Sequence, residues 1–228
     1  DHGCGSGATL LYLLARGYTG IHGVDVGGAC AGWNTLLAAE YGIEQPRFFV
    51  YDGKRLPLGD ESIDLVFSQE VLEHVAPDVI DSYYGEEARV LRPGGIAFHQ
   101  VPHRLAPYDS HTGTWLLHYL PRPAYLAIHR RFGEKADFVE NQLFLRWPWV
   151  HRRAMRRHFG GCSDLTLDRL QALDRLDYYD GPAGLRRFVG QAVRTPVIGV
   201  PAGFLLKNLV MLDTLSVKGR RNPRSDAK

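Results

Sequence analysis

A glycine-rich segment at the start of the chain, Asp1-His2-Gly3-Cys4-Gly5-Ser6-Gly7, constrains the fold more than any other stretch. Its three glycines, at alternate positions, let a backbone turn tightly and approach a ligand where a Cβ atom would collide. The apolar run that follows, residues 8–15, predicts a helix whose free N–H groups and positive dipole end face the same ligand. The spacing alone is equally typical of an ordinary turn or helix N-cap, so its meaning depends on the rest of the chain.

Strand-like and helix-like segments alternate over the first hundred residues. We expect helices over residues 8–16, 29–41 and 77–91 and strands over residues 20–25, 47–51, 63–67 and 96–101. Arg92-Pro93-Gly94-Gly95 separates the last helix from the last strand. This alternation predicts an α/β fold with a Rossmann-like, doubly wound and mostly parallel sheet. A glycine loop of this kind ordinarily follows a buried strand, so we expect the sequence to be a fragment that lacks its first strand.

The second half of the chain has a different character. Residues 102–147 are rich in aromatic residues, histidine and proline, and we interpret them as an insertion after the fifth strand that caps the site formed by residues 1–101. Short helices are expected there over residues 115–118 and 123–132. Residues 148–228 are expected to be a C-terminal α/β lobe that completes the sheet and ends in a basic tail. Its expected elements are helices over residues 149–159, 170–177 and 183–193 and strands over residues 162–167 and 212–218.

Composition narrows the classes of protein to which the chain can belong. With 228 residues, 45% of them hydrophobic, and a net charge of +2, it has the composition of a soluble globular protein. So weak a positive balance does not favour nucleic acid as a partner. Three widely spaced cysteines without a CxxC pair favour a reducing, cytoplasmic setting. We expect no signal peptide, and the given sequence has no uninterrupted apolar stretch of about 20 residues.

A carboxylate follows the first expected strand. Asp25 comes 18 residues after Gly7, close to the spacing of about 20 at which an acidic residue meets the ribose hydroxyls in dinucleotide-binding folds. A solvated aspartate at a strand end is the alternative. Together, the glycine loop and Asp25 indicate a nucleotide-like ligand.

With further motifs added, the chain resembles the class I S-adenosylmethionine-dependent methyltransferases. The matching pieces, in order, are the opening Asp-x-Gly-x-Gly-x-Gly, Gly23-Val24-Asp25, Tyr51-Asp52-Gly53, Ser68-Gln69-Glu70-Val71-Leu72-Glu73-His74-Val75 and Leu91-Arg92-Pro93-Gly94-Gly95. The resemblance covers about the first hundred residues. Beyond it, Tyr108-Asp109-Ser110-His111 is similar to a subgroup linked to surface-glycan or lipid biosynthesis.

The resemblance implies S-adenosylmethionine as the cofactor and assigns eight residues to it. These are Asp1, Gly3 and Gly5 at the methionine end, Asp25 at the ribose hydroxyls, Asp52 and Gly53 at the adenine, and Ser68 and Gln69 under the sulfonium. His2 departs from the family pattern, which has an aliphatic residue at this position. Cys4 has no expected nucleophilic role, because methyl transfer needs no covalent intermediate.

Methyl transfer requires alignment and exclusion of water, and a hydroxyl acceptor also benefits from a general base. We predict His111, oriented by Asp109, as that base, with His74 as a further catalytic residue. His99 and His103 are competing candidates. The alternative for His111 is a loop histidine in solvent.

A second hypothesis concerns metal. Glu70, Glu73 and His74 have the i, i+3, i+4 spacing that places side chains on one face of a helix, where they could hold a divalent ion. The same motif also makes structural hydrogen bonds in metal-free relatives, and our prediction includes no metal. A fourth ligand from His103, His111 or His118 would favour the metal.

Basic residues gather near the end of the chain. Four arginines occur between Arg152 and Arg157, and more basic residues follow Gly219. A solvated helix face and tail are the default interpretation. The alternative is a patch for an anionic acceptor or a peripheral membrane contact, helped by the apolar stretch over residues 197–212.

These observations predict methyl transfer from S-adenosylmethionine to a small-molecule, lipid or glycan acceptor at oxygen. A metal-assisted RNA or quinone O-methyltransferase is one alternative. A methyltransferase-like binding domain without catalysis is another. The sequence leaves the acceptor and the oligomeric state open.

Overall fold

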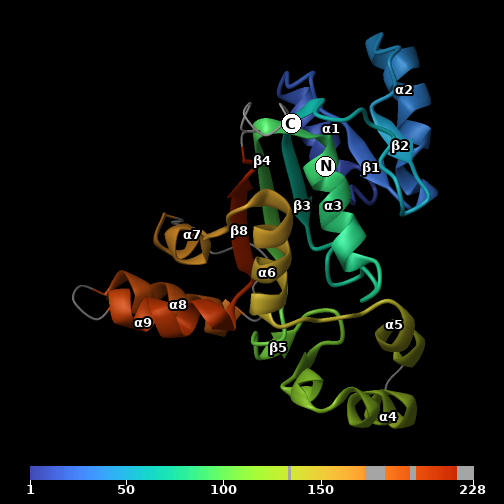
Figure 1. The fold of residues 1–228 in the computed structure, drawn as a ribbon. Helices are drawn as coiled ribbons and strands as arrows, with labels where there is room; N and C mark the ends of the chain where they lie inside the picture. Colours follow the sequence, from blue (N-terminus) through green and yellow to red (C-terminus); the bar gives the residue numbers. More distant parts are fainter. Residues whose placement is uncertain (133–134, 173–182, 196–198, 220–228) are drawn as a thin grey trace, which may run out of the picture.

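The described part of the chain forms an α/β arrangement in which two groups of strands make up the main sheet and two helices cover one of its faces (Figure 1). The computed structural model describes residues 1–132, 135–172, 183–195 and 199–219. Strands β1 (Gly23–Asp25) and β2 (Phe48–Val50) pair in parallel. Strands β3 (Ile63–Gln69), β4 (Leu91–Val101), β8 (Leu212–Val217) and β7 (Ser163–Asp164) form a second group in that order.

The first three residues of the chain join the two groups of strands. His2 forms a parallel bridge with Val24 of β1, and its N–H donates to the carbonyl of Phe67 in β3 at 2.9 Å. β3 and β4 run in parallel, whereas β8 runs antiparallel to both β4 and β7. The expectation of a Rossmann-like, mostly parallel sheet is therefore confirmed.

Two helices pack on the strands β4 and β8. These are α3 (Ile80–Val90) and α6 (Pro148–Phe159), and they contact each other as well as the sheet (Figure 1). Pro148 begins α6 because its missing N–H costs nothing in a first helical turn, and Gly160, with φ of 82°, ends it. Between helices and sheet lies the main core, which includes Tyr84, Leu91, Ala97, Met155 and Phe159.

A smaller core stabilises the edge of the sheet that carries the glycine loop. Helix α1 (Ala8–Ala15), the 3-10 turn η1 (Gly28–Cys30) and helix α2 (Gly32–Tyr41) surround β2. Their buried contacts come from Leu10, Cys30, Leu37 and Phe48. These elements agree with the expected helices over residues 8–16 and 29–41.

Strand β4 begins earlier than expected. It starts at Leu91, not at Ile96, so the motif expected to separate helix from strand lies within the strand. The pairing with β3 jumps from Ile63 opposite Leu91 to Leu65 opposite Ile96, and Gly94 has φ of 86°. The intervening residues thus bulge out of the ladder, as proline and glycine permit.

Residues 102–147 form the segment that was expected to be an insertion. They fold into a hairpin of β5 (Tyr108–Asp109) and β6 (Thr114–Trp115), the 3-10 turn η2 (Leu117–Tyr119), and helices α4 (Arg122–Phe132) and α5 (Ala136–Asn141). Tyr125, Val139 and Leu143 form a core of their own. The hairpin was not expected, because each of its strands has only two residues and no alternating pattern reveals them.

The remaining elements lie beside β8 (Figure 1). They are α7 (Thr166–Ala172), α8 (Ala183–Arg194), α9 (Gly199–Leu206) and the 3-10 turn η3 (Lys207–Leu209). The expected helix over residues 170–177 begins earlier, and its last five positions lie outside the described residues, as does the basic tail from residue 220 onward. Among the described residues, none of the helices has the length and apolar character that crossing a bilayer requires. The proposed divisions after residues 101 and 147 stay predictions.

Candidate functional site

The glycine loop turns sharply between the first residues and α1. The N–H groups of Gly3 and Cys4 both donate to the carbonyl of Val24, at 2.7 and 3.2 Å, and this fixes the loop to the end of β1. Gly3, Gly5 and Gly7 all have positive φ, at 88°, 54° and 82°. A Cβ atom at Gly3 would lie 2.4 Å from the side chain of Val71, and one at Gly7 would lie 2.4 Å from the ring of Phe48. Only glycine satisfies both demands there.

Gly5 differs from its two neighbours because a Cβ atom there would meet nothing within 4 Å. The space belongs to a hollow of about 250 Å³, here called the loop hollow. It is lined by Asp1, Gly3, Cys4, Gly5, Ser6, Ala8, Thr9 and Gln69. Three of the residues expected at the methionine end of a cofactor therefore line one hollow, together with Gln69.

Asp25 stands at the mouth of the loop. Its Oδ2 accepts from the N–H of Gly5 at 2.8 Å and its Oδ1 from the N–H of Gly27 at 2.7 Å. Each carboxylate oxygen keeps a further lone pair, so both can still accept from a diol. Val26, the next residue, is 63% exposed and lies 3.5 Å from the position of a Cβ atom on Gly53. Val26 was not expected at the site from the sequence, and its exposed apolar side chain beside Asp25 is suited to contact an adenine.

The Asp52–Gly53 turn lies across from Asp25. Oδ1 of Asp52 accepts from the N–H groups of Lys54 and Arg55 at 2.9 and 3.1 Å, and these bonds lower the pKa of the exposed carboxyl. Gly53 has φ of 74°, a conformation that favours glycine.

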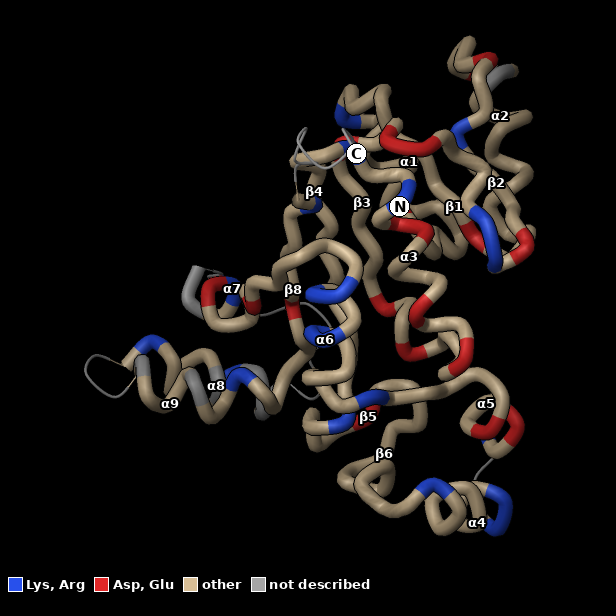
Figure 2. Tube along the Cα trace, in the orientation of Figure 1, with Lys and Arg blue, Asp and Glu red and all other residues tan. Residues whose placement is uncertain are grey.

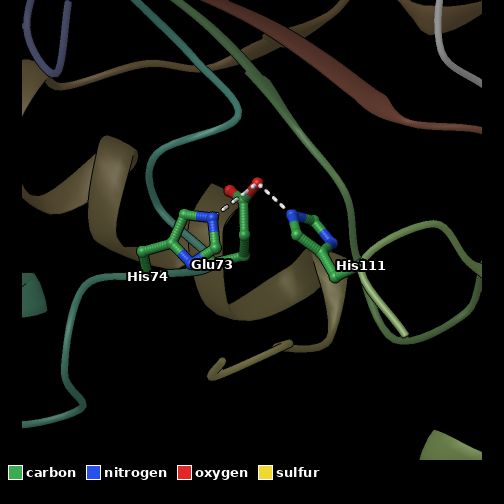
Figure 3. A group of neighbouring side chains, drawn as sticks. All are labelled: Glu73, His74 and His111. Atoms are coloured by element: carbon green, nitrogen blue, oxygen red, sulfur yellow. Dashed lines mark ion pairs between the residues drawn. The ribbon is translucent and has the colours of Figure 1, made fainter. Parts of the chain in front are cut away.

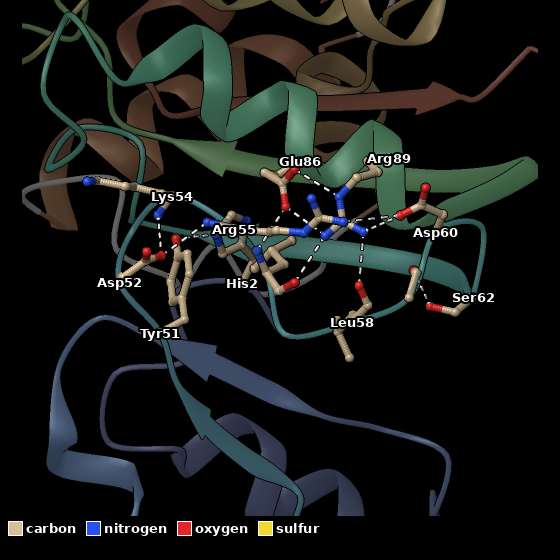
Figure 4. A network of polar contacts seen from close by, with 12 residues as sticks. His2, Tyr51, Asp52, Lys54, Arg55, Leu58, Asp60, Ser62, Glu86 and Arg89 are labelled. Carbon is tan, nitrogen blue, oxygen red and sulfur yellow. Dashed lines mark hydrogen bonds and ion pairs between the residues drawn. The ribbon is translucent and has the colours of Figure 1, made fainter.

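Arg89 of α3 holds the segment after this turn in place. Its guanidinium donates to the carbonyls of Leu56 and Leu58, both at 3.0 Å, and to the carboxylates of Glu86 and Asp60 (Figure 4). One side chain thus fixes the loop between β2 and β3, on which the position of Asp52 depends.

His2 is buried and fully engaged, although the family pattern has an aliphatic residue there. Its Nδ1 bonds to Glu87 at 2.9 Å, its Nε2 bonds to the Tyr51 hydroxyl at 2.8 Å, and its ring stacks on Tyr83. The other oxygen of Glu87 bonds to Nε2 of His99 at 2.7 Å. Burial alone would raise the pKa of Glu87, but His99 and His2 outweigh it and hold the pKa at about 2. The polar residue at this position is therefore accommodated by a buried network.

Ser68 and Gln69 point to opposite sides of the end of β3, as successive strand residues do. Gln69 lines the loop hollow. Ser68 is buried, and its hydroxyl bonds to that of Tyr83 at 2.9 Å. Of the two residues expected under the sulfonium, the structure thus places only Gln69 at the hollow, and Ser68 instead joins the core.

The segment after β3 is a turn and not a helix, which corrects the expectation for Glu70, Glu73 and His74. Glu70 has φ of 54°, and α3 begins only at Ile80. The three side chains therefore do not share a helical face. Instead, Glu73 and His74 meet His111, which lies between β5 and β6 (Figure 3).

His111 lies between two carboxylates. Its Nδ1 is 3.2 Å from Oδ1 of Asp109, and its Nε2 is 3.4 Å from Oε1 of Glu73. Burial alone would lower the pKa of His111, but the hydrogen bond to Asp109 and the nearby charge of Glu73 outweigh it and raise the pKa to about 9. At neutral pH and without other ligands, both ring nitrogens of His111 therefore carry a hydrogen, so the resting imidazole is an acid. Its role as a base stays a prediction, whereas its orientation by Asp109 is present in the structure.

The competing histidines lie in the interior. His99 is bonded to Glu87, and His103 is 2% exposed with a pKa lowered to about 4, chiefly by burial. Nε2 of His118 bonds to the carbonyl of Ala106 at 2.9 Å. Neither His103 nor His118 belongs to the group that Glu73 forms with His74 and His111. Burial also raises the pKa of Cys4 to about 12, which agrees with the expectation of no nucleophilic role.

The glycine loop and the turn after β3 are in contact. The side chain of Val71 packs directly against Gly3, and Glu73 follows two residues later. Two residues span at most about 7 Å of chain, so the Cα of Glu73 lies within about 7 Å of that of Val71. The polar group around Glu73 is therefore beside the loop.

The sequence profile of the methyltransferase domain family matches residues 1–99. Those residues therefore match a methyltransferase domain, and the motifs in them are similar to those of the class I S-adenosylmethionine-dependent methyltransferases. The loop hollow, the free space at Gly5 and the two accepting oxygens of Asp25 fit the methionine and ribose parts of the cofactor that this family uses.

Similar proteins include enzymes with different acceptors. A probable tocopherol O-methyltransferase of Oryza sativa is 36% identical over 95 residues, which are 41% of this chain and 26% of that protein. A sterol 24-C-methyltransferase of Gibberella zeae is 33% identical over 99 residues, which are 42% of this chain and 25% of that protein. The chain thus matches only about a quarter of the length of either relative.

The fold is shared with solved structures at lower sequence identity. A geranyl diphosphate C-methyltransferase from Streptomyces coelicolor superposes with a TM-score of 0.53 at 17% identity, covering 96% of this chain and 70% of that one. An S-adenosylmethionine-dependent methyltransferase from Mesorhizobium loti gives 0.54 at 16% identity, covering 95% and 88%. The likeness extends the family fold beyond the matched residues, into the C-terminal half of the chain.

Proposed function

We propose that the protein transfers the methyl group of S-adenosylmethionine to an oxygen atom of a small-molecule, lipid or glycan acceptor. The observation that carries this proposal is the contact between the two halves of the site. The loop hollow and Asp25 provide the cofactor side, and the turn that packs on Gly3 presents Glu73 toward His111. The cofactor supplies a methyl group that is already activated as a sulfonium.

The residues of the chain have three tasks in this reaction. Asp25 accepts hydrogen bonds from the ribose hydroxyls, and the loop glycines leave room for the methionine part. Gln69, at the end of β3, lines the loop hollow, and its proposed task is to lie beside the methyl group. The group formed by Asp109, His111 and Glu73 handles the acceptor proton, which a hydroxyl must lose as its oxygen is methylated.

The choice of acceptor class rests on the relatives. Those named above act on tocopherol and sterol, and the solved structure on geranyl diphosphate, all of them small lipid-like molecules. Two of the three are C-methyltransferases by name, so oxygen as the acceptor atom rests on the polar group beside the loop. The proposed localisation is cytoplasmic, with a peripheral membrane contact where the acceptor is a lipid.

Calorimetric titration with S-adenosylhomocysteine, followed by transfer assays with labelled S-adenosylmethionine, tests the proposal. We expect a single binding site and label in the extracted acceptor, in a product whose fragmentation places the methyl group on oxygen. Binding without transfer to any of the three acceptor classes would support the alternative of a binding domain without catalysis. Absence of S-adenosylhomocysteine binding by the full-length protein would refute the proposed methyltransferase activity.

A further inference from the structure

Three side chains beside the glycine loop converge on one point. Glu73, His74 and His111 each offer one ligand atom, and these atoms all lie within 4.8 Å of one another (Figure 3). Oε1 of Glu73 is 3.4 Å from Nε2 of His111 and 3.8 Å from Nε2 of His74. We call these three residues the Glu73 cluster.

Both imidazoles are held so that Nε2 faces the carboxylate. Nδ1 of His74 lies 2.7 Å from the carbonyl of Gln142, and Nδ1 of His111 lies 3.2 Å from Oδ1 of Asp109. A carbonyl or an ionised carboxylate can only accept, so each Nδ1 carries a hydrogen. In the neutral rings both Nε2 atoms then direct a lone pair toward Glu73, which is the arrangement that orients metal-binding histidines.

Apart from the two histidines, the charge of Glu73 is faced by the guanidinium of Arg146, whose N–H groups donate to the backbone carbonyls of Leu72 and Val75 and not to the carboxylate. Glu73 is 1% exposed, and neither carboxylate oxygen accepts a hydrogen bond from the described part of the chain. Its backbone is fixed, because Phe144 donates to its carbonyl at 2.6 Å. A buried carboxylate without hydrogen bonds is costly unless a cation compensates it.

We propose that the Glu73 cluster binds one divalent cation of the first transition series, such as zinc. Two imidazole nitrogens and one carboxylate oxygen suit these ions, whereas magnesium and calcium prefer oxygen ligands. Ligand atoms about 2.0 to 2.1 Å from a tetrahedral ion lie about 3.3 Å apart. The distances of 3.4 and 3.8 Å therefore require little movement.

The site leaves at least one coordination position for a further ligand, and this deepens the proposed function on which it rests. With the cation bound, Glu73 and His111 would act on the acceptor proton through the cation and not as bases themselves. An acceptor hydroxyl bound there would lose its proton to water more readily, because the cation stabilises the resulting oxyanion. The oxygen then forms a bond to the methyl carbon as the electrons of the S–CH₃ bond return to sulfur. The substrate class implied is an alcohol or phenol.

Titration of the metal-free, full-length protein with cobalt(II) or zinc(II) alone tests the site without any measurement of activity. We expect one equivalent to bind, with a visible cobalt absorption typical of nitrogen and oxygen ligands in low coordination. Glu73→Gln and His111→Ala should each weaken binding about 100-fold or more, and Asp109→Asn about 10- to 100-fold, the usual loss for a residue that orients a ligand. His158→Ala is the matched control, because this histidine bonds to Asp81 on another part of the surface.

The outcomes separate this proposal from the proposed function. Absence of cobalt binding, or binding that Glu73→Gln and His111→Ala leave unchanged, overturns the metal site and means that a proton on His111, together with the charge of Arg146, compensates Glu73. Titration with S-adenosylhomocysteine in the same samples reports on the cofactor side independently. Circular dichroism identifies a variant that does not fold, and His74→Ala then replaces it.

Discussion

At the scale of single residues, Gly5 and Gly7 impose different demands although both have positive φ. We predict that Gly7→Ala lowers the free energy of unfolding by roughly 2 to 4 kcal/mol, because strain adds to a collision with the Phe48 ring. Gly5→Ala should cost only about 1 kcal/mol of stability, because its Cβ atom enters open space. That space is the loop hollow, so Gly5→Ala should instead weaken cofactor binding. Urea unfolding and calorimetric titration of both variants check the contrast, which equal effects on stability would contradict.

A second prediction at the scale of single residues concerns the carboxylate of Asp25. Replacing Asp25 with alanine should weaken the binding of S-adenosylhomocysteine by about 1 to 3 kcal/mol, through loss of charge-assisted hydrogen bonds. Part of that loss comes from the loop, because Asp25 also accepts from the N–H of Gly5. Asp64→Ala is the control, since Asp64 is an exposed aspartate paired with Arg92. Calorimetric titration measures both, and an unchanged affinity for Asp25→Ala removes this residue from the site.

At the scale of elements, Glu87 ties α3 to the first residues of the chain and to β4. Its pKa is about 2 in the folded protein, below the ordinary value of 4.5. A lowered pKa stabilises the fold above pH 4.5, and this contribution is lost as the pH falls toward 2. We therefore predict that about 2 to 4 kcal/mol of stability disappears over this range.

Urea unfolding between pH 6 and pH 2.5 measures this loss. Glu87→Gln should be less stable at pH 6 and should show a flatter dependence on pH than the unmodified chain. Glu44→Gln, a change at an exposed glutamate, serves as the control. Parallel curves for the unmodified chain and Glu87→Gln would mean that the buried network does not couple folding to protonation.

The helices and strands differ in how far they could be predicted from the sequence. The order of helices and strands follows from glycine and proline punctuation and from apolar runs, which act locally, and it was predicted. The spacing of Glu70, Glu73 and His74 also fits a helix locally, but the turn is held by distant partners. Phe144 donates to the carbonyl of Glu73, and Arg146 donates to that of Leu72. Contacts so far apart in the chain leave no local pattern, so the meeting of Glu73 with His111 could not be predicted from spacing.

At the scale of the whole molecule, the cofactor side and the acceptor side come from different parts of the chain. Residues 1–99 carry the family match and the loop hollow, whereas Asp109 and His111 belong to the hairpin of β5 and β6. The family match therefore indicates the cofactor but not the acceptor. The acceptor depends on residues after 101, where family motifs are sparse.

The elements beside β8 lead to the last prediction, a contact with an anionic membrane surface. Phe188 of α8 and Leu205 of α9 are 59% and 77% exposed, and Arg187 and Arg194 are also exposed on α8. Figure 2 shows further basic positions on α6. Of these, Arg152 and Arg157 already pair with Asp164 and Asp81, which leaves α8 as the stronger candidate.

Flotation with vesicles that contain anionic lipid measures this contact. We expect binding at low salt, with each basic residue near the surface contributing about 1 kcal/mol, and a decrease as salt screens the charges. Replacing both Phe188 and Leu205 with serine should abolish flotation while leaving the affinity for S-adenosylhomocysteine unchanged, because both side chains belong to elements outside the loop hollow. Replacing both Tyr12 and Tyr18 with serine is the matched control, because these side chains are also exposed but lie in α1 and just after it, far from α8 and α9 along the chain. Protein that stays entirely in the lower fraction at low salt excludes the membrane contact and favours a water-soluble acceptor.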